Sequence, residues 1–116
     1  MGTAGMVAGG AVVVGVVVTG AAAGIGRAVV GLFADAGAAV IVSDLDGDEA
    51  RLVADGIVAA GGRADSASCN VTDDDDLESL VDLAVTRFGR IDVLVNNAGG
   101  GGPKPFDMTM ADFEWA

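Results

Sequence analysis

Short runs of apolar, largely β-branched residues alternate along this chain with segments in which apolar residues recur every three or four positions. Four of the runs are predicted to be strands: Val12–Val18, Ala39–Ser43, Arg63–Cys69 and Ile91–Val95. The first run is almost entirely valine, which is typical of a parallel strand covered on both faces. The run at 63–69 has few bulky residues and is the weakest of the four.

The segments between the runs have the spacing of helices that bury one face. In the first helix this face is predicted to hold Ile25, Val29, Leu32 and Phe33. Gly37 ends that helix as a C-terminal cap would. The second helix, from about 47 to 60, is predicted to turn Leu52, Val53 and Ile57 inward, and Gly61-Gly62 ends it.

A third helix is predicted to begin at Thr72, a good N-cap, with Asp75 completing a pattern like a capping box. Its inner face is expected to hold Leu77, Leu80, Val81, Ala84 and Phe88. A loop follows the fourth strand over 96–105, and Thr109 is predicted to cap another helix. The order β-α-β-α-β-α-β with short, right-handed connections predicts one parallel sheet with helices on both faces.

Composition limits the possible functions. The chain has 116 residues, enough for one small domain, in which 1–10 are expected to be a glycine-rich lead-in. Its net charge of −11 argues against a nucleic-acid partner and against binding to an anionic membrane. The absence of histidine excludes a His-based triad or a His-ligated metal. The lone Cys69 excludes an internal disulfide and fits a reducing, cytoplasmic compartment.

Two other features have competing interpretations. The first 26 residues carry no charge, but they hold eight glycines and no basic region, which argues against a membrane span or a signal peptide. The four aspartates at 73–76 suggest a metal site. We favour the first turn of a helix instead, because carboxylates there are stabilised by the helix dipole and consecutive side chains point in different directions.

The most informative stretch follows the first strand and reads Thr19-Gly20-Ala21-Ala22-Ala23-Gly24-Ile25-Gly26. Glycines let the backbone turn tightly and approach a ligand closely. The N-terminus of the following helix offers unpaired N–H groups to a phosphate. A strand, a glycine-rich turn and a helix together predict a dinucleotide site in a Rossmann-type, doubly wound sheet over residues 11–116.

Asp44 lies 18 residues after Gly26, at the end of the second strand. An acidic residue there accepts hydrogen bonds from the adenosine ribose hydroxyls in dinucleotide folds. Its charge repels the extra phosphate of NADP, and no basic residue stands at 21–23 or directly after Asp44. The sequence therefore predicts NAD as the cofactor, although a strand-end aspartate could also simply start a turn.

Three motifs in order, Thr19-Gly20-x-x-x-Gly24-Ile25-Gly26, Asp44 and Asn96-Asn97-Ala98-Gly99, resemble the short-chain dehydrogenase/reductase family. Within the family, residues 99–113 resemble the bacterial 7α-hydroxysteroid dehydrogenases. The resemblance implies an oxidoreductase that passes a hydride between a secondary alcohol, such as a bile acid, and NAD. It also implies a homotetramer for the full-length form.

The resemblance also implies a role for individual residues. The pyrophosphate turn would be lined by Gly20, Gly24, Ile25 and Gly26. The adenosine ribose would be held by Asp44 and Leu45, and the adenine by Asn70 and Val71. Asn97 would lie beside the cofactor, Asn96 would brace the sheet, and Gly101 would contact the substrate. The glycines could instead be ordinary turn residues, Val71 core and Gly101 loop.

Three departures from the family matter. Asn70 stands where an aspartate is common, although its amide oxygen could still accept from the adenine amino group. Gly15 lies inside the first strand, where a glycine weakens pairing and packing. The family's catalytic serine and Tyr-x-x-x-Lys motif are missing, since the chain has no tyrosine and Lys104 is its only lysine. We therefore expect these 116 residues alone to be inactive, with the sheet truncated after its fourth strand.

Other functions stay open at this point. The chain could be a non-catalytic dinucleotide-binding module, or a fragment too unstable to fold because one strand edge is left open. Within the enzyme class, a reductase of oxoacyl groups on an acyl carrier is the rival, and Asp44 argues against it because those reductases usually prefer NADP.

Overall fold

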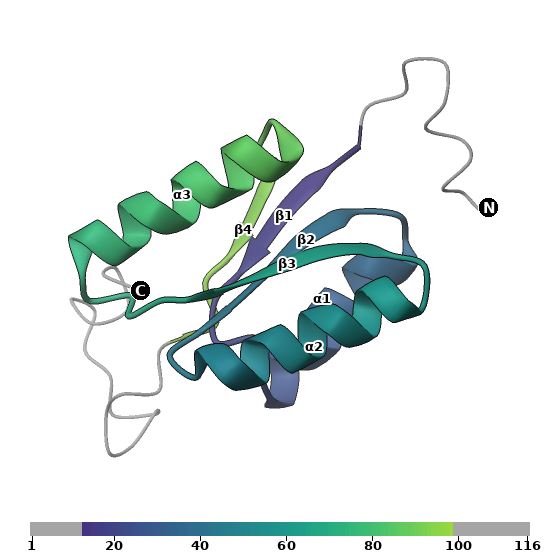
Figure 1. The fold of residues 1–116 in the computed structure, drawn as a ribbon, viewed down its shortest axis with the longest axis horizontal. Coiled ribbons are helices and arrows are strands. Elements are labelled where there is room, and N and C mark those ends of the chain that lie inside the picture. The colour runs from purple at the N-terminus through teal and green to yellow at the C-terminus, as the bar shows by residue number, and fades with distance from the viewer. Residues whose placement is uncertain (1–12, 99–116) are drawn as a thin grey trace.

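The computed structural model describes residues 13–98, which form seven alternating elements (Figure 1). In chain order these are β1 (Gly15–Val18), α1 (Gly24–Asp35), β2 (Ala39–Asp44), α2 (Gly47–Ala59), β3 (Arg63–Ser68), α3 (Asp74–Phe88) and β4 (Val93–Val95). The predicted lead-in at 1–10, Gly101 and the helix capped by Thr109 lie outside the described residues.

All four strands are parallel, in the order β3-β2-β1-β4. Helices α1 and α2 cover one face of the sheet and α3 covers the other (Figure 1). The predicted α/β class and doubly wound arrangement are confirmed. The first two right-handed β-α-β connections run outward from β1 through β2 to β3, and α3 then returns to β4 on the far side of β1.

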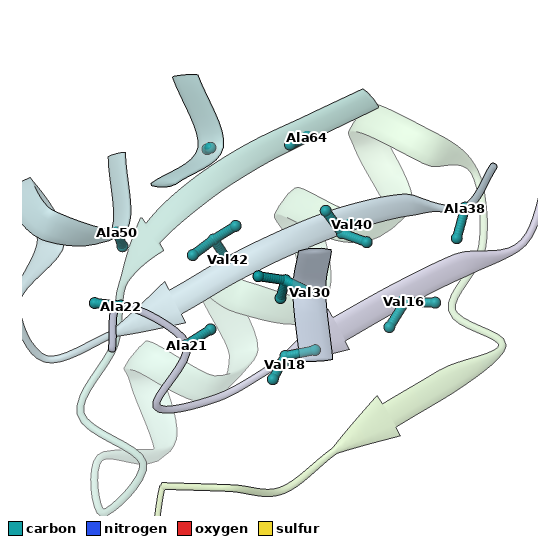
Figure 2. Packing of buried hydrophobic residues seen from close by; sticks show 11 residues of the cluster. Val16, Val18, Ala21, Ala22, Val30, Ala38, Val40, Val42, Ala50 and Ala64 are labelled. Carbon is teal, nitrogen blue, oxygen red and sulfur yellow. The ribbon is translucent and has the colours of Figure 1, made fainter. Parts of the chain in front are cut away.

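The core lies against the two central strands. Alternate residues of a strand point to opposite faces, so Val16 and Val42 pack toward α1 and α2 (Figure 2). Val17 and Ile41 pack toward α3. β1 is buried along its whole length, as predicted, but it begins at Gly15 rather than at residue 12, and Val14 is already 44% exposed.

The inner faces of the helices were predicted only in part. Val29, Phe33, Val53 and Ile57 pack against the core, whereas Ile25, Leu32, Leu52 and Val81 are exposed. In α3 the predicted Leu80 and Ala84 are buried. In the other two helices the most buried positions are small or β-branched instead: Gly26 and Val30 in α1, and Ala50 and Ala54 in α2. Small side chains let a helix approach the sheet closely, so the buried stripe is narrower than apolar spacing suggests.

Helix α3 begins one residue later than predicted. Its N-cap is Asp73, whose carboxylate accepts from the backbone N–H groups of Asp75 at 2.9 Å and Asp76 at 3.2 Å. Thr72 was the wrong choice because its hydroxyl donates to the Asn70 side-chain oxygen. The remaining aspartates lie in the first turn, where the dipole favours them. Within residues 13–98, no group of three or more His, Cys, Asp or Glu side chains could hold a metal ion.

Close packing against Arg90 explains the glycine at position 15. A Cβ built on it would lie 2.3 Å from the carbonyl oxygen of Arg90, far inside van der Waals contact. Its N–H donates to Asp92 Oδ2 at 2.7 Å, and the Asp92 N–H donates to the Gly15 carbonyl at 2.8 Å. Arg90 also donates to this carboxylate. These hydrogen bonds, led by the one from Arg90, hold the pKa of Asp92 below its ordinary value.

No helix within the described part of the chain is long and apolar enough to cross a membrane.

Candidate functional site

The glycine-rich turn joins the carboxyl end of β1 to α1. Gly20 and Gly24 have φ of +62° and +59°, a conformation that costs glycine little and other residues much. A Cβ on Gly26 would lie 2.3 Å from the Gly20 carbonyl oxygen, so the first turn of α1 packs directly on the loop. The structure thus explains why a glycine stands at each of these three positions.

The N-terminus of α1 differs from those of α2 and α3. Its N-cap is Ala23, no side chain accepts from its first N–H groups, and its first turn contains no acid. By contrast, α2 is capped by Asp46 and α3 by Asp73, each followed by further acidic residues. The positive end of the α1 dipole is therefore open to an external anion, although the chain as a whole is strongly acidic.

Thr19 joins the turn to the end of β4. Its buried hydroxyl oxygen accepts from the backbone N–H groups of Asn97 and Ala98, both at 3.1 Å. The hydroxyl lies 3.3 Å from the Asn96 side-chain oxygen and 3.4 Å from the Val95 carbonyl oxygen, either of which can accept its single proton. Asn97 Nδ2 donates to the Gly20 carbonyl at 3.0 Å. Asn97 thus lies at the glycine-rich turn and Asn96 lies beside Thr19, while the place of Asn97 beside a coenzyme stays a prediction.

Sequence reasoning missed the part played by Thr19. The available signal was a polar residue directly after an unbroken apolar strand, because a buried hydroxyl needs hydrogen-bond partners.

Asp44 closes the other side of the turn. Its Oδ2 accepts from the Ala22 N–H at 3.0 Å, and its Oδ1 accepts from the Asp46 N–H at 3.0 Å. The carboxylate is half-buried and held by two backbone donors from different loops. Each oxygen keeps further acceptor capacity, so the group can still receive two hydroxyls from a ligand.

The end of β3 lies against the end of β2. The Cys69 N–H donates to the Asp44 carbonyl at 2.9 Å, and the Ser68 hydroxyl donates to the Leu45 carbonyl at 3.3 Å. Leu45 is 71% exposed, and Asn70 and Val71 follow at the same edge. Burial raises the pKa of the Cys69 thiol, which points into the core beneath this surface.

All predicted site residues within 13–98 therefore lie at the carboxyl edge of the sheet, the edge at which open α/β sheets bind ligands. Two clefts open elsewhere. One of about 520 Å³ separates α1 from α2, and another of about 580 Å³ is lined by Arg63, Arg87 and Arg90. Both reach the opposite, amino edge, and neither contains the glycine-rich turn or Asp44, so we do not assign the predicted chemistry to them.

The chain is similar to known proteins in both sequence and fold. The family described as short chain dehydrogenase matches residues 15–115. The 7α-hydroxysteroid dehydrogenase of Escherichia coli (strain K12) is 52% identical over 75 residues, which are 65% of this chain and 29% of that protein. The cyclohexanol dehydrogenase of an Acinetobacter species is 40% identical over 58 residues, 50% of this chain and 23% of that one.

A solved structure of 7α-hydroxysteroid dehydrogenase in complex with NADH and 7-oxoglycochenodeoxycholic acid is similar in fold, with a TM-score of 0.75 and 50% identity. The match covers 89% of this chain and 40% of that one. The chain thus spans less than half the length of the relatives it matches. The predicted resemblance to this group is confirmed.

Proposed function

Because this chain belongs to the short-chain dehydrogenase family, we propose that its carboxyl edge binds NAD, as the coenzyme-binding part of an oxidoreductase acting on secondary alcohols. When bound, NAD supplies the acceptor for a hydride from the alcohol carbon. The residues described above would hold and orient the coenzyme.

The observation that carries this proposal is the open N-terminus of α1. Of the three helices within residues 13–98, α2 and α3 cover their first N–H groups with aspartates, and α1, which follows the glycine-rich turn, does not. A diphosphate placed over Gly24, Ile25 and Gly26 would receive these N–H groups and the positive end of the dipole. Gly20 and the lack of a Cβ at the turn would let the phosphates approach the backbone.

Asp44 would select the coenzyme. Its carboxylate is already oriented by Ala22 and Asp46, so it cannot turn away without losing two hydrogen bonds. Ribose hydroxyls would fill its remaining acceptor positions, whereas a 2′-phosphate would meet a fixed negative charge. We therefore propose NAD over NADP.

The other residues would complete the coenzyme site. Exposed Leu45 would cover the ribose, Asn70 and Val71 would contact the base, and Asn97 would lie beside the coenzyme near Gly20. Together with Gly20 and Asp44, these positions follow the ends of the neighbouring strands β3, β2, β1 and β4, which matches the extended shape of a dinucleotide.

For the substrate we propose a steroid alcohol of the bile-acid type, which Gly101 would contact. Support comes from the 52% identity to the Escherichia coli 7α-hydroxysteroid dehydrogenase. The catalytic serine and the Tyr-x-x-x-Lys motif are not among these residues, so we propose that this chain binds NAD without turning over a substrate. A longer protein with those residues would be a homotetramer, and we propose a cytoplasmic location, with which the lone, buried Cys69 is consistent.

The placement can be tested by titrating the 116-residue chain with NAD while recording backbone amide NMR signals. We expect shifts at residues 20–26, 44–45, 70–71 and 97. Shifts centred on the cleft between α1 and α2, or no shifts at millimolar NAD, would contradict the assignment. The substrate is tested separately in a longer protein that includes the catalytic residues. Such a protein should oxidise a 7α-hydroxy bile acid, and failure to oxidise any hydroxysteroid would refute that part.

A further inference from the structure

Asn70 lies directly after β3, beside the carboxylate proposed to hold the ribose. The preceding residue, Cys69, donates its N–H to the Asp44 carbonyl at 2.9 Å, so the two strand ends are in contact. The Asn70 side chain is exposed at this edge. If the diphosphate lies at the end of β1 and the ribose at the end of β2, as proposed above, the base comes next, at the end of β3.

The orientation of the Asn70 amide is fixed by its own neighbours. The backbone N–H of Thr72 donates to Asn70 Oδ1 at 3.0 Å, and the Thr72 hydroxyl donates to the same oxygen at 2.6 Å. A backbone N–H can only donate, so the atom that faces it must be the oxygen of the amide. Both lone pairs of Oδ1 are then in use.

Asn70 therefore offers the base a donor and no free acceptor. Within residues 13–98, Asn70 Nδ2 and the backbone N–H of Val71 donate to no other protein atom, whereas the Asn70 N–H is taken by Asp76 Oδ2 at 2.9 Å. Two neighbouring donors thus remain at the place where the base is proposed to bind. The expectation that the Asn70 oxygen accepts from the adenine amino group does not fit this arrangement.

Purines differ at position 6 in the group that would meet these donors. Adenine has an amino group there, which donates, whereas hypoxanthine has a carbonyl oxygen, which accepts. Adenine offers N1 or N7 to one of the two donors and leaves the other facing an amine. Hypoxanthine offers the two acceptors O6 and N7 on one edge, whereas on the other edge it offers O6 beside N1–H, which donates. On that second edge it leaves one donor unmatched, as adenine does.

We propose that Asn70 is a specificity-determining residue that makes this site tolerant of 6-oxopurine nucleotides, so that the hypoxanthine analogue of NAD binds about as well as NAD. The proposal rests on the proposed coenzyme site and adds which purines that site accepts. An aspartate at position 70 would still accept from Thr72 with one carboxylate oxygen. Its second oxygen would replace the donor Nδ2 with an acceptor, which would restore selection for the 6-amino group.

The test compares the dissociation constants of the 116-residue chain for NAD and for nicotinamide hypoxanthine dinucleotide, measured by calorimetry near pH 7. The two ligands carry the same charge, so their ratio cancels any general repulsion from the acidic surface. In the wild type we expect the constants to agree within about threefold. In Asn70→Asp we expect NAD to be favoured by about tenfold or more. The new carboxylate would accept a hydrogen bond from the adenine amino group but would meet the carbonyl oxygen of hypoxanthine, which cannot donate.

Thr72→Ser is the matched control, because it keeps both the hydroxyl and the backbone N–H that occupy Asn70 Oδ1. Its ratio should equal that of the wild type. A wild-type preference for NAD of more than about threefold would overturn the proposal, and so would an Asn70→Asp ratio equal to the wild-type ratio. Binding of neither dinucleotide would refute the coenzyme site itself, an outcome distinct from binding of both without the expected change in ratio.

Discussion

Adding one methyl group to Gly26 should damage the coenzyme turn, whereas the same change at Gly31 in the same helix should not. A Cβ on Gly26 would lie 2.3 Å from the Gly20 carbonyl oxygen and 2.6 Å from Asn97 Nδ2. Ordinary contacts for such an atom begin at 3.4 Å, so the loop would have to move by about 1 Å. Gly31 has no atom within 4 Å of its virtual Cβ.

The magnitude follows from these contacts. The two atoms that block the methyl group are the donor and the acceptor of one hydrogen bond, Asn97 Nδ2 to the Gly20 carbonyl at 3.0 Å. Neither can withdraw alone without breaking that bond. We expect Gly26→Ala to lower the free energy of unfolding by about 1–3 kcal/mol, as overpacking does. Gly31→Ala should raise it by up to about 1 kcal/mol, because alanine is the better helix former.

Urea unfolding of both variants measures this difference, and calorimetry with NAD measures its effect on binding. Gly26→Ala should also weaken NAD binding, because the displaced turn no longer presents the first N–H groups of α1. Gly31→Ala should bind as the wild type does. Equal stability and equal NAD affinity of the two variants would refute the packing argument.

Three further predictions concern carboxylates and the thiol. In the coenzyme-free chain, Asp44→Ala should speed hydrogen exchange of the Ala22 amide by about tenfold or more, while Asp44→Asn, which keeps an acceptor, should change it less. Identical exchange in the wild type and both variants would contradict the hydrogen bond from the Ala22 N–H to Asp44. The lowered pKa of Asp92 means that its carboxylate stabilises the fold above its ordinary value near 3.8 and that this contribution is lost as pH falls through the lowered pKa. The stability gap between wild type and Asp92→Asn in denaturant titrations should therefore close in acid, and a gap independent of pH would argue against the ion pair with Arg90. Burial raises the pKa of the Cys69 thiol, so a thiol reagent at neutral pH should modify it only as the chain opens, and immediate modification of the native chain would disprove its burial.

The sheet could be predicted from the sequence because its signal is local. Unbroken valine runs indicate strands buried on both faces, and Gly37 and Gly61, with φ of +96° and +94°, end the helices where the pattern stops. The spacing from Gly26 to Asp44 placed both at one edge, and the Ala22–Asp44 hydrogen bond joins their loops there.

The buried faces of the helices could not be predicted in the same way. Leu32 and Leu52 have helical spacing and apolar side chains, yet they are 70% and 63% exposed. The contact with the sheet is made instead by Val30 and Ala54, since the distance between helix and sheet sets the size of the side chains that fit. That distance depends on the whole packed layer, and no local pattern contains it.

Contacts between distant loops were also beyond the sequence. Thr72 and Asp73 are both good caps, and the choice between them depends on Asn70, which takes the Thr72 hydroxyl. The same contact decides which atom of Asn70 is free to meet a base. The role of Thr19 likewise depends on Asn97 and Ala98, nearly 80 residues away in the chain.

The account is tested most directly by calorimetric titration of this chain, or of a longer form, with NAD and with NADP under identical conditions. An open helix N-terminus beside a carboxylate fixed by Ala22 and Asp46 predicts that NAD binds more tightly by about tenfold or more, since bringing like charges together costs more than about 1.4 kcal/mol. Equal or tighter binding of NADP, or binding of neither coenzyme, would contradict it.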